Sequence, residues 1–178
     1  MDSINRNQPE KNHEDLHGSD AGKKIKQLAE GAKSCFFCTA ITSGGPVKTR
    51  PMSPQKVGEN GTFWFLSASD SHKNAEIGQD DKVQLFFQGN PHSDFLSVYG
   101  QASISNDKAL IHELWNPLLR TWFTQGKDDP RITVIKVETL DGYYWDNKHG
   151  NMVAFAKMLA GAALGKTLDD SIEGKVEI

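Results

Sequence analysis

Two short apolar runs near the middle of the chain limit the folds that it can adopt. They span residues 62–66 and 82–88 and are too short for surface helices, and both are rich in the side chains that strands favour. Further strands are expected at residues 34–42, 47–57, 94–105 and 132–145, and Pro51 and Pro54 make the second of these an edge or bulged strand. We therefore predict a mainly β protein with flanking helices, built as a small six-stranded antiparallel barrel.

A helix N-terminus is expected directly after the first of these runs. Ser71 is the expected N-cap, because its hydroxyl can accept from N–H groups that the first turn leaves unpaired. Lys73 lies in that turn, where the helix dipole disfavours a cation unless an anion is nearby. A phosphate site would combine Ser67, Ser71, His72 and Lys73 with Arg50, whose planar guanidinium suits a phosphate. The alternative is an ordinary capped helix with a solvated lysine.

Five segments, in a fixed order, carry a resemblance to a known family. They read TRPM at residues 49–52, FWFLS at 63–67, SHK at 71–73, VQLFF at 83–87 and GYYW at 142–145. In this order and spacing they resemble the pyridoxamine 5'-phosphate oxidase-like, FMN-binding split-barrel proteins, and specifically their bacterial general stress protein branch. The resemblance spans residues 24–146. It implies a split barrel that binds FMN, with FAD as the alternative flavin.

The resemblance also implies where the flavin lies. In that family the R-x-M segment runs along the isoalloxazine ring, which carries over to Arg50, Pro51 and Met52, with core packing as the alternative for Met52. By the same resemblance Trp145 approaches the flavin across a dimer interface, while plugging of a barrel end is its alternative role. The cofactor-binding residues expected from the resemblance and the local chemistry together are Arg50, Pro51, Met52, Leu66, Ser67, Ser71, His72, Lys73 and Trp145.

A homodimer is the expected assembly. Trp64 and Phe65 are neighbours on one expected strand, so their side chains point to opposite faces. One of them should face the core and the other the exterior or a partner chain. An exterior aromatic side chain on such a strand indicates a subunit interface.

The chain departs from the true oxidases after its late tryptophan. The oxidases carry there an arginine- and histidine-bearing segment that grips the vitamin phosphate, whereas residues 146–150 read DNKHG. His72 also stands where the oxidases commonly use arginine. Oxidation of vitamin B6 is therefore not expected, while flavin binding is. The sequence contains no Ser-His-Asp order, paired-carboxylate motif or P-loop, so it nominates no catalytic residue.

Three functions remain open from the sequence. The first is a flavin-dependent oxidoreductase that acts on an unidentified small molecule. The second is a flavin-binding stress protein that buffers or senses without turnover. The third is a split barrel that holds FAD, a deazaflavin or haem, because a fold alone does not fix its ligand.

Composition restricts the class of protein. The 178 residues are enough for one domain with a real core. A formal charge of −3 gives no reason to expect nucleic-acid binding. No apolar run approaches the roughly 18 residues of a membrane span. The N-terminal residues are polar and do not form a signal peptide, so a cytoplasmic location is expected.

We divide the chain into a mobile polar leader at residues 1–22, a flavin-binding domain at 23–166 and a polar tail at 167–178. The domain includes an expected apolar helix at residues 151–164. His13 and His17 have the spacing of a metal pair on a helix, but a solvated pair is the preferred interpretation in so polar a segment. No metal site is expected.

Cys35 and Cys38 form a C-x-x-C pair inside an expected strand. Residues three apart on a strand point to opposite faces, which opposes both a disulfide and shared metal ligation. We interpret both as structural thiols, with a redox dithiol as the alternative.

Overall fold

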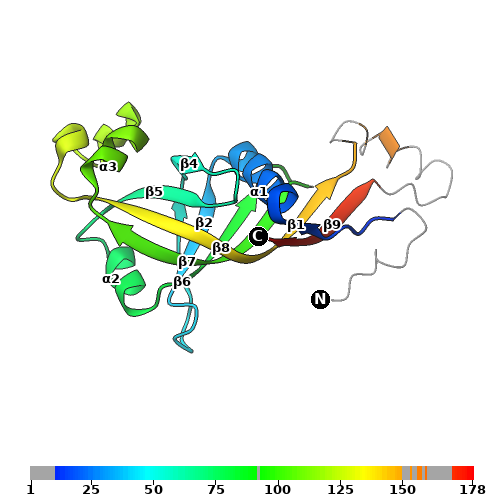
Figure 1. Ribbon diagram of the computed structural model, residues 1–178, viewed down its shortest axis with the longest axis horizontal. Coiled ribbons are helices and arrows are strands. Elements are labelled where there is room, and N and C mark those ends of the chain that lie inside the picture. The colour runs from blue at the N-terminus through cyan, green and yellow to red at the C-terminus, as the bar shows by residue number, and fades with distance from the viewer. Residues whose placement is uncertain (1–10, 92, 150–152, 154–155, 158, 160–169) are drawn as a thin grey trace.

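The structure, a computed structural model, describes residues 11–91, 93–149, 153, 156–157, 159 and 170–178. Nine strands form one open sheet in the described part of the chain, ordered β1-β9-β8-β7-β6-β2-β3, and β5 joins it by pairing with β8 and β4 (Figure 1). The strands are β1 Leu16–His17, β2 Cys35–Thr39, β3 Lys48–Met52, β4 Lys56–Val57, β5 Phe63–Ala68, β6 Lys82–Gln88, β7 Phe95–Ser105, β8 Ile132–Asn147 and β9 Ser171–Glu177. The helices are α1 Gly18–Ala32, α2 His72–Gln79 and α3 Lys108–Leu114, with 3-10 turns η2 Pro117–Thr121 and η3 Gly126–Asp128.

The six predicted strands are present as β2, β3, β5, β6, β7 and β8, and the open sheet has the architecture of a split barrel. All the pairings among these strands are antiparallel. The longest pairing joins β7 to β8, and its register shifts between Tyr99 and Gly100. A Cβ at Gly100 would meet the carbonyl oxygen of Glu138 at 2.7 Å, so the close approach of the two strands at this point requires a glycine.

The predicted strand at residues 47–57 is two strands. β3 ends at Met52, and β4 begins at Lys56 and pairs with β5 instead of β2. Pro54 lies between them and has no N–H to donate to a ladder. β3 itself pairs only with β2, so Pro51 lies on an edge strand as its missing N–H requires.

The two faces of β5 enter two separate apolar clusters. Phe63 and Phe65 are fully buried in the main core, which α1 covers through Ile25 and Leu28. Trp64 packs from the other face of β5 in a second cluster. The segment from α3 to η3, residues 108–128, is the α3 lobe, and it covers this face. The second cluster contains Leu66, Ile111, Leu114, Phe123, Ile132 and Val134. The alternation of Trp64 and Phe65 is confirmed, but the exterior ring meets a lobe of the same chain.

Both termini are more ordered than predicted. Helix α1 begins at Gly18, so residues 11–22 do not form a mobile leader; residues 1–10 lie outside the described part. The expected tail contains β9, which pairs with β8 and, in parallel, with β1. The Tyr144 hydroxyl donates to the carbonyl oxygen of Glu14 at 3.0 Å and ties the leader to β8. The predicted helix at 151–164 lies mostly outside the described residues.

Candidate functional site

The first turn of α2 is built on a buried polar network at one end of the sheet. Ser71 caps the helix as predicted, because its Oγ accepts from the backbone N–H of Asn74 at 3.4 Å. The hydroxyls of Ser67 and Ser71 both donate to Asn74 Oδ1, at 2.8 and 3.2 Å. Asn74 in turn donates to Thr133 Oγ1 on β8 at 2.8 Å. The network fixes the β5–α2 loop against the sheet.

Asn74 was missed from the sequence, although an asparagine in a first helical turn is a signal for local hydrogen bonding. The buried positions of α2 are Asn74 and Ile77, whereas Ala75 is exposed. Ser67 is only 2% exposed, so its hydroxyl supports the loop from beneath.

Arg50 reaches the same helix from β3. Its Nη1 donates to Thr39 Oγ1 and its Nη2 to Glu76 Oε2, both at 2.6 Å. The Thr39 hydroxyl also donates to Glu76 Oε2, which closes the triangle. Burial raises the pKa of Glu76, but the hydrogen bonds from Thr39 and Arg50 outweigh this effect, so its pKa lies below the usual range. Thr39 and Glu76 were also missed, because they come from elements that meet only in the folded chain.

Lys73 lies beside this triangle. Burial lowers the pKa of its ammonium, and the positive charge of Arg50 lowers it further. Arg50 is hydrogen-bonded to Glu76, which lies three residues after Lys73 on α2, so the fold brings Arg50 to the helix turn that carries Lys73. His72 is exposed one turn before Glu76, and its charge helps to lower the Glu76 pKa. Ser67, Ser71, His72 and Lys73 thus gather with Arg50 around the start of α2.

The remaining predicted residues lie elsewhere. The side chain of Leu66 is buried in the second cluster, on the face of β5 opposite Ser67, so only its backbone can reach the polar group. Met52 is half-buried against the main core, as in the packing alternative. The β2–β3 register pairs Arg50 with Phe37 and Pro51 with Phe36. Since successive residues alternate, Arg50 and Pro51 point to opposite faces of the sheet.

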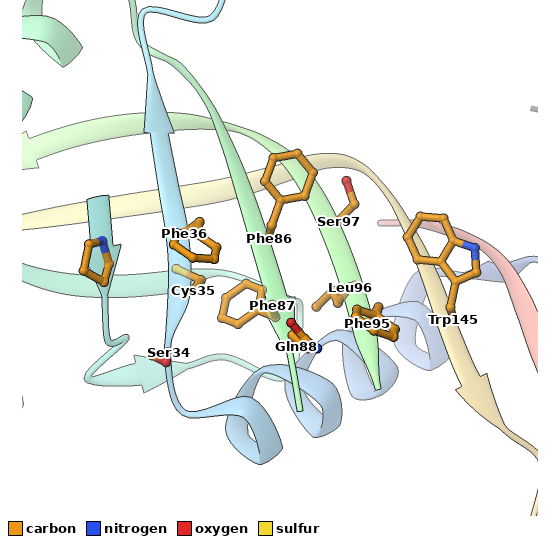
Figure 2. A pocket seen from close by; sticks show the side chains of 11 residues that line it. Ser34, Cys35, Phe36, Phe86, Phe87, Gln88, Phe95, Leu96, Ser97 and Trp145 are labelled. Carbon is orange, nitrogen blue, oxygen red and sulfur yellow. The ribbon is translucent and has the colours of Figure 1, made fainter. Parts of the chain in front are cut away.

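Pro51 and Trp145 share an aromatic cavity on that opposite face. The cavity has a volume of about 550 Å³ and opens to solvent (Figure 2). Phe36 and Phe86 form its most open part, since they are 58% and 47% exposed. It is lined by Ser34, Cys35, Phe36, Pro51, Phe86, Phe87, Gln88, Phe95, Leu96, Ser97 and Trp145. Trp145 therefore does not join the Arg50–Lys73 group within one chain.

The segment that departs from the true oxidases has partners of its own. His149 Nδ1 lies 2.7 Å from Asp170 Oδ1, and Lys157 donates to the same oxygen at 2.5 Å. Burial raises the pKa of Asp170, but these two hydrogen bonds outweigh it and hold the pKa at about 2. The cluster joins the end of β8 to the approach to β9.

The other candidate residues form no metal site in the part of the chain that the structure describes. Among the described residues, no three His, Cys, Asp or Glu side chains are placed to share a metal ion. His13 contacts Asp15 and His17 contacts Glu177, so the two histidines do not form a pair. None of the described helices is long and apolar enough to cross a membrane.

Comparison with known proteins gives the family. The family described as pyridoxamine 5'-phosphate oxidase like matches residues 20–169, which is most of the chain. The chain belongs to this family. Among curated relatives, the chain is 29% identical over 83 residues to general stress protein 26 of Bacillus subtilis, covering 45% of this chain and 59% of that protein. It is also 28% identical over 110 residues to protein bli-3 of Neurospora crassa, covering 57% of this chain and 53% of that protein. The chain thus spans little more than half the length of these relatives.

Solved structures of family members share the fold. General stress protein 26 from Jannaschia sp. CCS1 superposes with a TM-score of 0.74 at 18% identity, covering 90% of this chain and 99% of that one. The general stress FMN/FAD binding protein from Xanthomonas citri gives a TM-score of 0.54 at 26% identity, covering 68% and 82%. These likenesses confirm the split barrel of the pyridoxamine 5'-phosphate oxidase-like family.

Proposed function

We propose that this pyridoxamine 5'-phosphate oxidase-like protein is a cytoplasmic flavoprotein that binds FMN, with the phosphate held at the start of α2. The observation that carries the proposal is the Ser71-capped N-terminus of α2, which holds Lys73 in its first turn and is joined to Arg50 of β3 through Glu76. A helix N-terminus and two cations favour an anion. The Xanthomonas citri protein, which is described as FMN/FAD binding, supports a flavin as the ligand.

The residues fit this cofactor in part. Lys73 is half-buried, so it loses part of its hydration without a bound anion, and a phosphate would offset that loss. Ser71 and His72 can add donors beside it. The flavin ring would then lie along the open edge of β3, next to Pro51 and Met52. FAD is the alternative ligand, since the same edge can hold the shared ring and first phosphate.

The proposed assembly is a homodimer. Phe36 and Phe86 are large, adjacent on paired strands and about half exposed, as expected of a surface that a second copy covers. A second copy seated there would bring its Trp145 toward the flavin bound by the first. Trp145 would then act across the interface, which accounts for its separation from Arg50 in one chain.

The proposed activity is that of a flavin-dependent oxidoreductase on an unidentified small molecule. A bound flavin would supply the redox chemistry, and the protein would supply its position and electrostatic environment. Arg50 and Lys73 would anchor the tail, and the aromatic cavity would exclude water from the ring. No described side chain is assigned as the acid or base of the reaction. A sensor or buffer that binds flavin without turnover is the second candidate.

The absorption spectrum of the purified protein is the first test. We expect a flavin band that is retained on gel filtration and, after denaturation, releases FMN identified by chromatography. Release of haem or a deazaflavin, or failure to bind added FMN and FAD, would refute flavin binding. Anaerobic NADH or NADPH then separates the two candidates. Bleaching followed by turnover with an acceptor supports the enzyme, whereas a stable oxidised spectrum supports the sensor.

A further inference from the structure

We propose that Thr39 and Glu76 are positioning residues for Arg50, and that they aim its guanidinium at the phosphate of the bound flavin. The inference rests on the proposed function, because it concerns the same site. It adds two residues that do not belong to the predicted binding set and that contact Arg50. Their role would be to hold a cation in its binding orientation before the ligand arrives.

The contacts around Arg50 form a closed unit. Arg50 donates one hydrogen bond from each terminal nitrogen, to Thr39 and to Glu76, and Thr39 donates to the same Glu76 oxygen. Thr39 is fully buried on β2, so it offers a fixed point on the sheet. Glu76 stands on α2, whose start is fixed by its capping network. The guanidinium is thus held between two rigid elements.

Arginine keeps donors for a ligand after making these contacts. A guanidinium has five N–H donors in a planar fork, and the two bonds to Thr39 and Glu76 use only part of them. Because the fork is planar, fixing two of its directions fixes the others. A ligand anion that meets a fixed fork does not have to order a long side chain, and this favours binding.

The charge of Glu76 lets an experiment distinguish two roles for this residue: positioning Arg50, and acting only as its counterion. The charged groups that face Glu76 are Arg50 from β3 and His72 from its own helix, and Lys73 lies beside them. If Glu76 served only as a counterion that competes with phosphate, its removal would strengthen FMN binding. If it positions Arg50, removal of the contact weakens FMN binding despite the loss of a negative charge. The two roles predict opposite signs.

The first experiment alters Thr39. FMN and riboflavin affinities are measured by fluorescence titration for the wild type, Thr39→Val and the matched control Thr39→Ser. Valine keeps the shape but removes the hydroxyl, so we expect FMN affinity to fall about three- to tenfold while riboflavin affinity is unchanged. Serine keeps the hydroxyl and should stay within about twofold of the wild type. A parallel fall for both ligands in Thr39→Val would overturn the proposal, since it would show a structural role alone.

The second experiment alters Glu76 in two ways. Glu76→Gln keeps an oxygen acceptor for Arg50, so its preference for FMN over riboflavin should equal or exceed that of the wild type. Glu76→Ala removes the acceptor, and its preference should fall severalfold. An equal or higher preference in Glu76→Ala would identify Glu76 as a competitor of the phosphate and reject positioning.

A measurement on ligand-free protein keeps this test apart from the proposed function. Restricted rotation of the Arg50 guanidinium should give separate, slowly exchanging Hη signals in nitrogen-15 NMR spectra. These signals should collapse in Thr39→Val and persist in Thr39→Ser. If the wild type showed the restricted signals but bound FMN no better than riboflavin, the proposed function would fail while the positioning of Arg50 stood. If the wild-type guanidinium rotated freely, the positioning role would fail.

Discussion

The polar residues around the start of α2 and the aromatic cavity lie on opposite faces of the same strands. The two regions differ in how far their side chains already have partners within the chain. At α2, Arg50 already has Thr39 and Glu76 as partners, and the serines are bound to Asn74. In the cavity, Phe36 and Phe86 present large apolar rings to solvent. The polar residues thus have their partners within one chain, whereas the rings of Phe36 and Phe86 stay about half exposed.

This difference separates two kinds of contribution to the proposed flavin binding. The polar group should discriminate flavins by their phosphate, because its donors and cations act on charge. The aromatic cavity should act on assembly and on the ring, which FMN and riboflavin share. Changes on the two faces should therefore produce different patterns with these two ligands.

The largest expected effect is on assembly. The double change Phe36→Asp and Phe86→Asp places two charges in the proposed interface and should weaken dimerisation on the order of a hundredfold or more, since buried aromatic contacts dominate interfaces. Analytical ultracentrifugation measures the effect. Leu118→Asp is the matched control, because Leu118 is 77% exposed on the other lobe and should leave the dimer unchanged. Dimers that survive the double change would place the interface elsewhere.

The next effect tests the polar side. Lys73→Ala should remove a charge-assisted hydrogen bond worth on the order of 1.5–3 kcal/mol and weaken FMN binding about tenfold or more. Riboflavin lacks the phosphate, so its affinity should hardly change. Fluorescence titration of both ligands gives the answer. Equal losses would show that Lys73 supports the fold and does not contact the phosphate.

A smaller effect is expected at Trp145. If its ring packs beside the flavin, Trp145→Leu should weaken FMN and riboflavin equally, by about two- to tenfold, because ring contacts are worth about 0.5–1.5 kcal/mol. Trp122→Leu is the control, since Trp122 is 65% exposed on the α3 lobe. A loss confined to FMN would contradict the division between the two faces.

The pH dependence of FMN binding tests the contribution of the Lys73 charge, which riboflavin binding should not show. Burial and the nearby Arg50 lower the pKa of Lys73 below 10.5, so its ammonium is lost at a lower pH than that of a free lysine. FMN affinity should therefore fall as the pH rises toward this pKa, and Lys73→Ala should abolish the fall. Titrations from pH 7 up to the usual lysine pKa of 10.5, with riboflavin as the reference, measure it. A matching fall for riboflavin would remove Lys73 as its cause.

Much of the polar side was predictable from sequence because it depends on local chemistry. The Ser71 cap and Lys73 follow from how a helix begins, and Arg50 follows from the resemblance and its planar fork. Thr39 and Glu76 were not predictable, since 37 positions separate them and nothing local relates them. Their contact exists only after β2 and α2 meet.

Prediction of the strands from the sequence was limited in the same way. Most of the six predicted strands have clear apolar patterns, whereas β9 reads SIEGKVE and carries few apolar residues. Its pairing depends on the length of β8, which offers residues 143–147 as a partner. A close approach also matters: a Cβ at Gly174 would lie 1.8 Å from the carbonyl oxygen of Glu14. A polar strand of this kind is specified by its neighbours.

The smallest effect is expected at the two cysteines of β2. Cys35 belongs to the main core, while Cys38 lies 3.3 Å from Thr49 Oγ1 on the next strand, so the two side chains diverge as predicted. Burial, together with Cys38, raises the pKa of Cys35 to about 12, so the thiol stays protonated and unreactive near neutral pH.

Cys35→Ala should therefore change FMN affinity less than about twofold, and dithiothreitol should not alter the flavin spectrum. Thiol labelling of the folded protein should be slow at pH 8 and become fast in urea, when the core opens. Rapid labelling of Cys35 in the native state, or a disulfide found by mass spectrometry, would mean that the strand opens readily. The core around Cys35 would then open to solvent more readily than its buried side chains indicate.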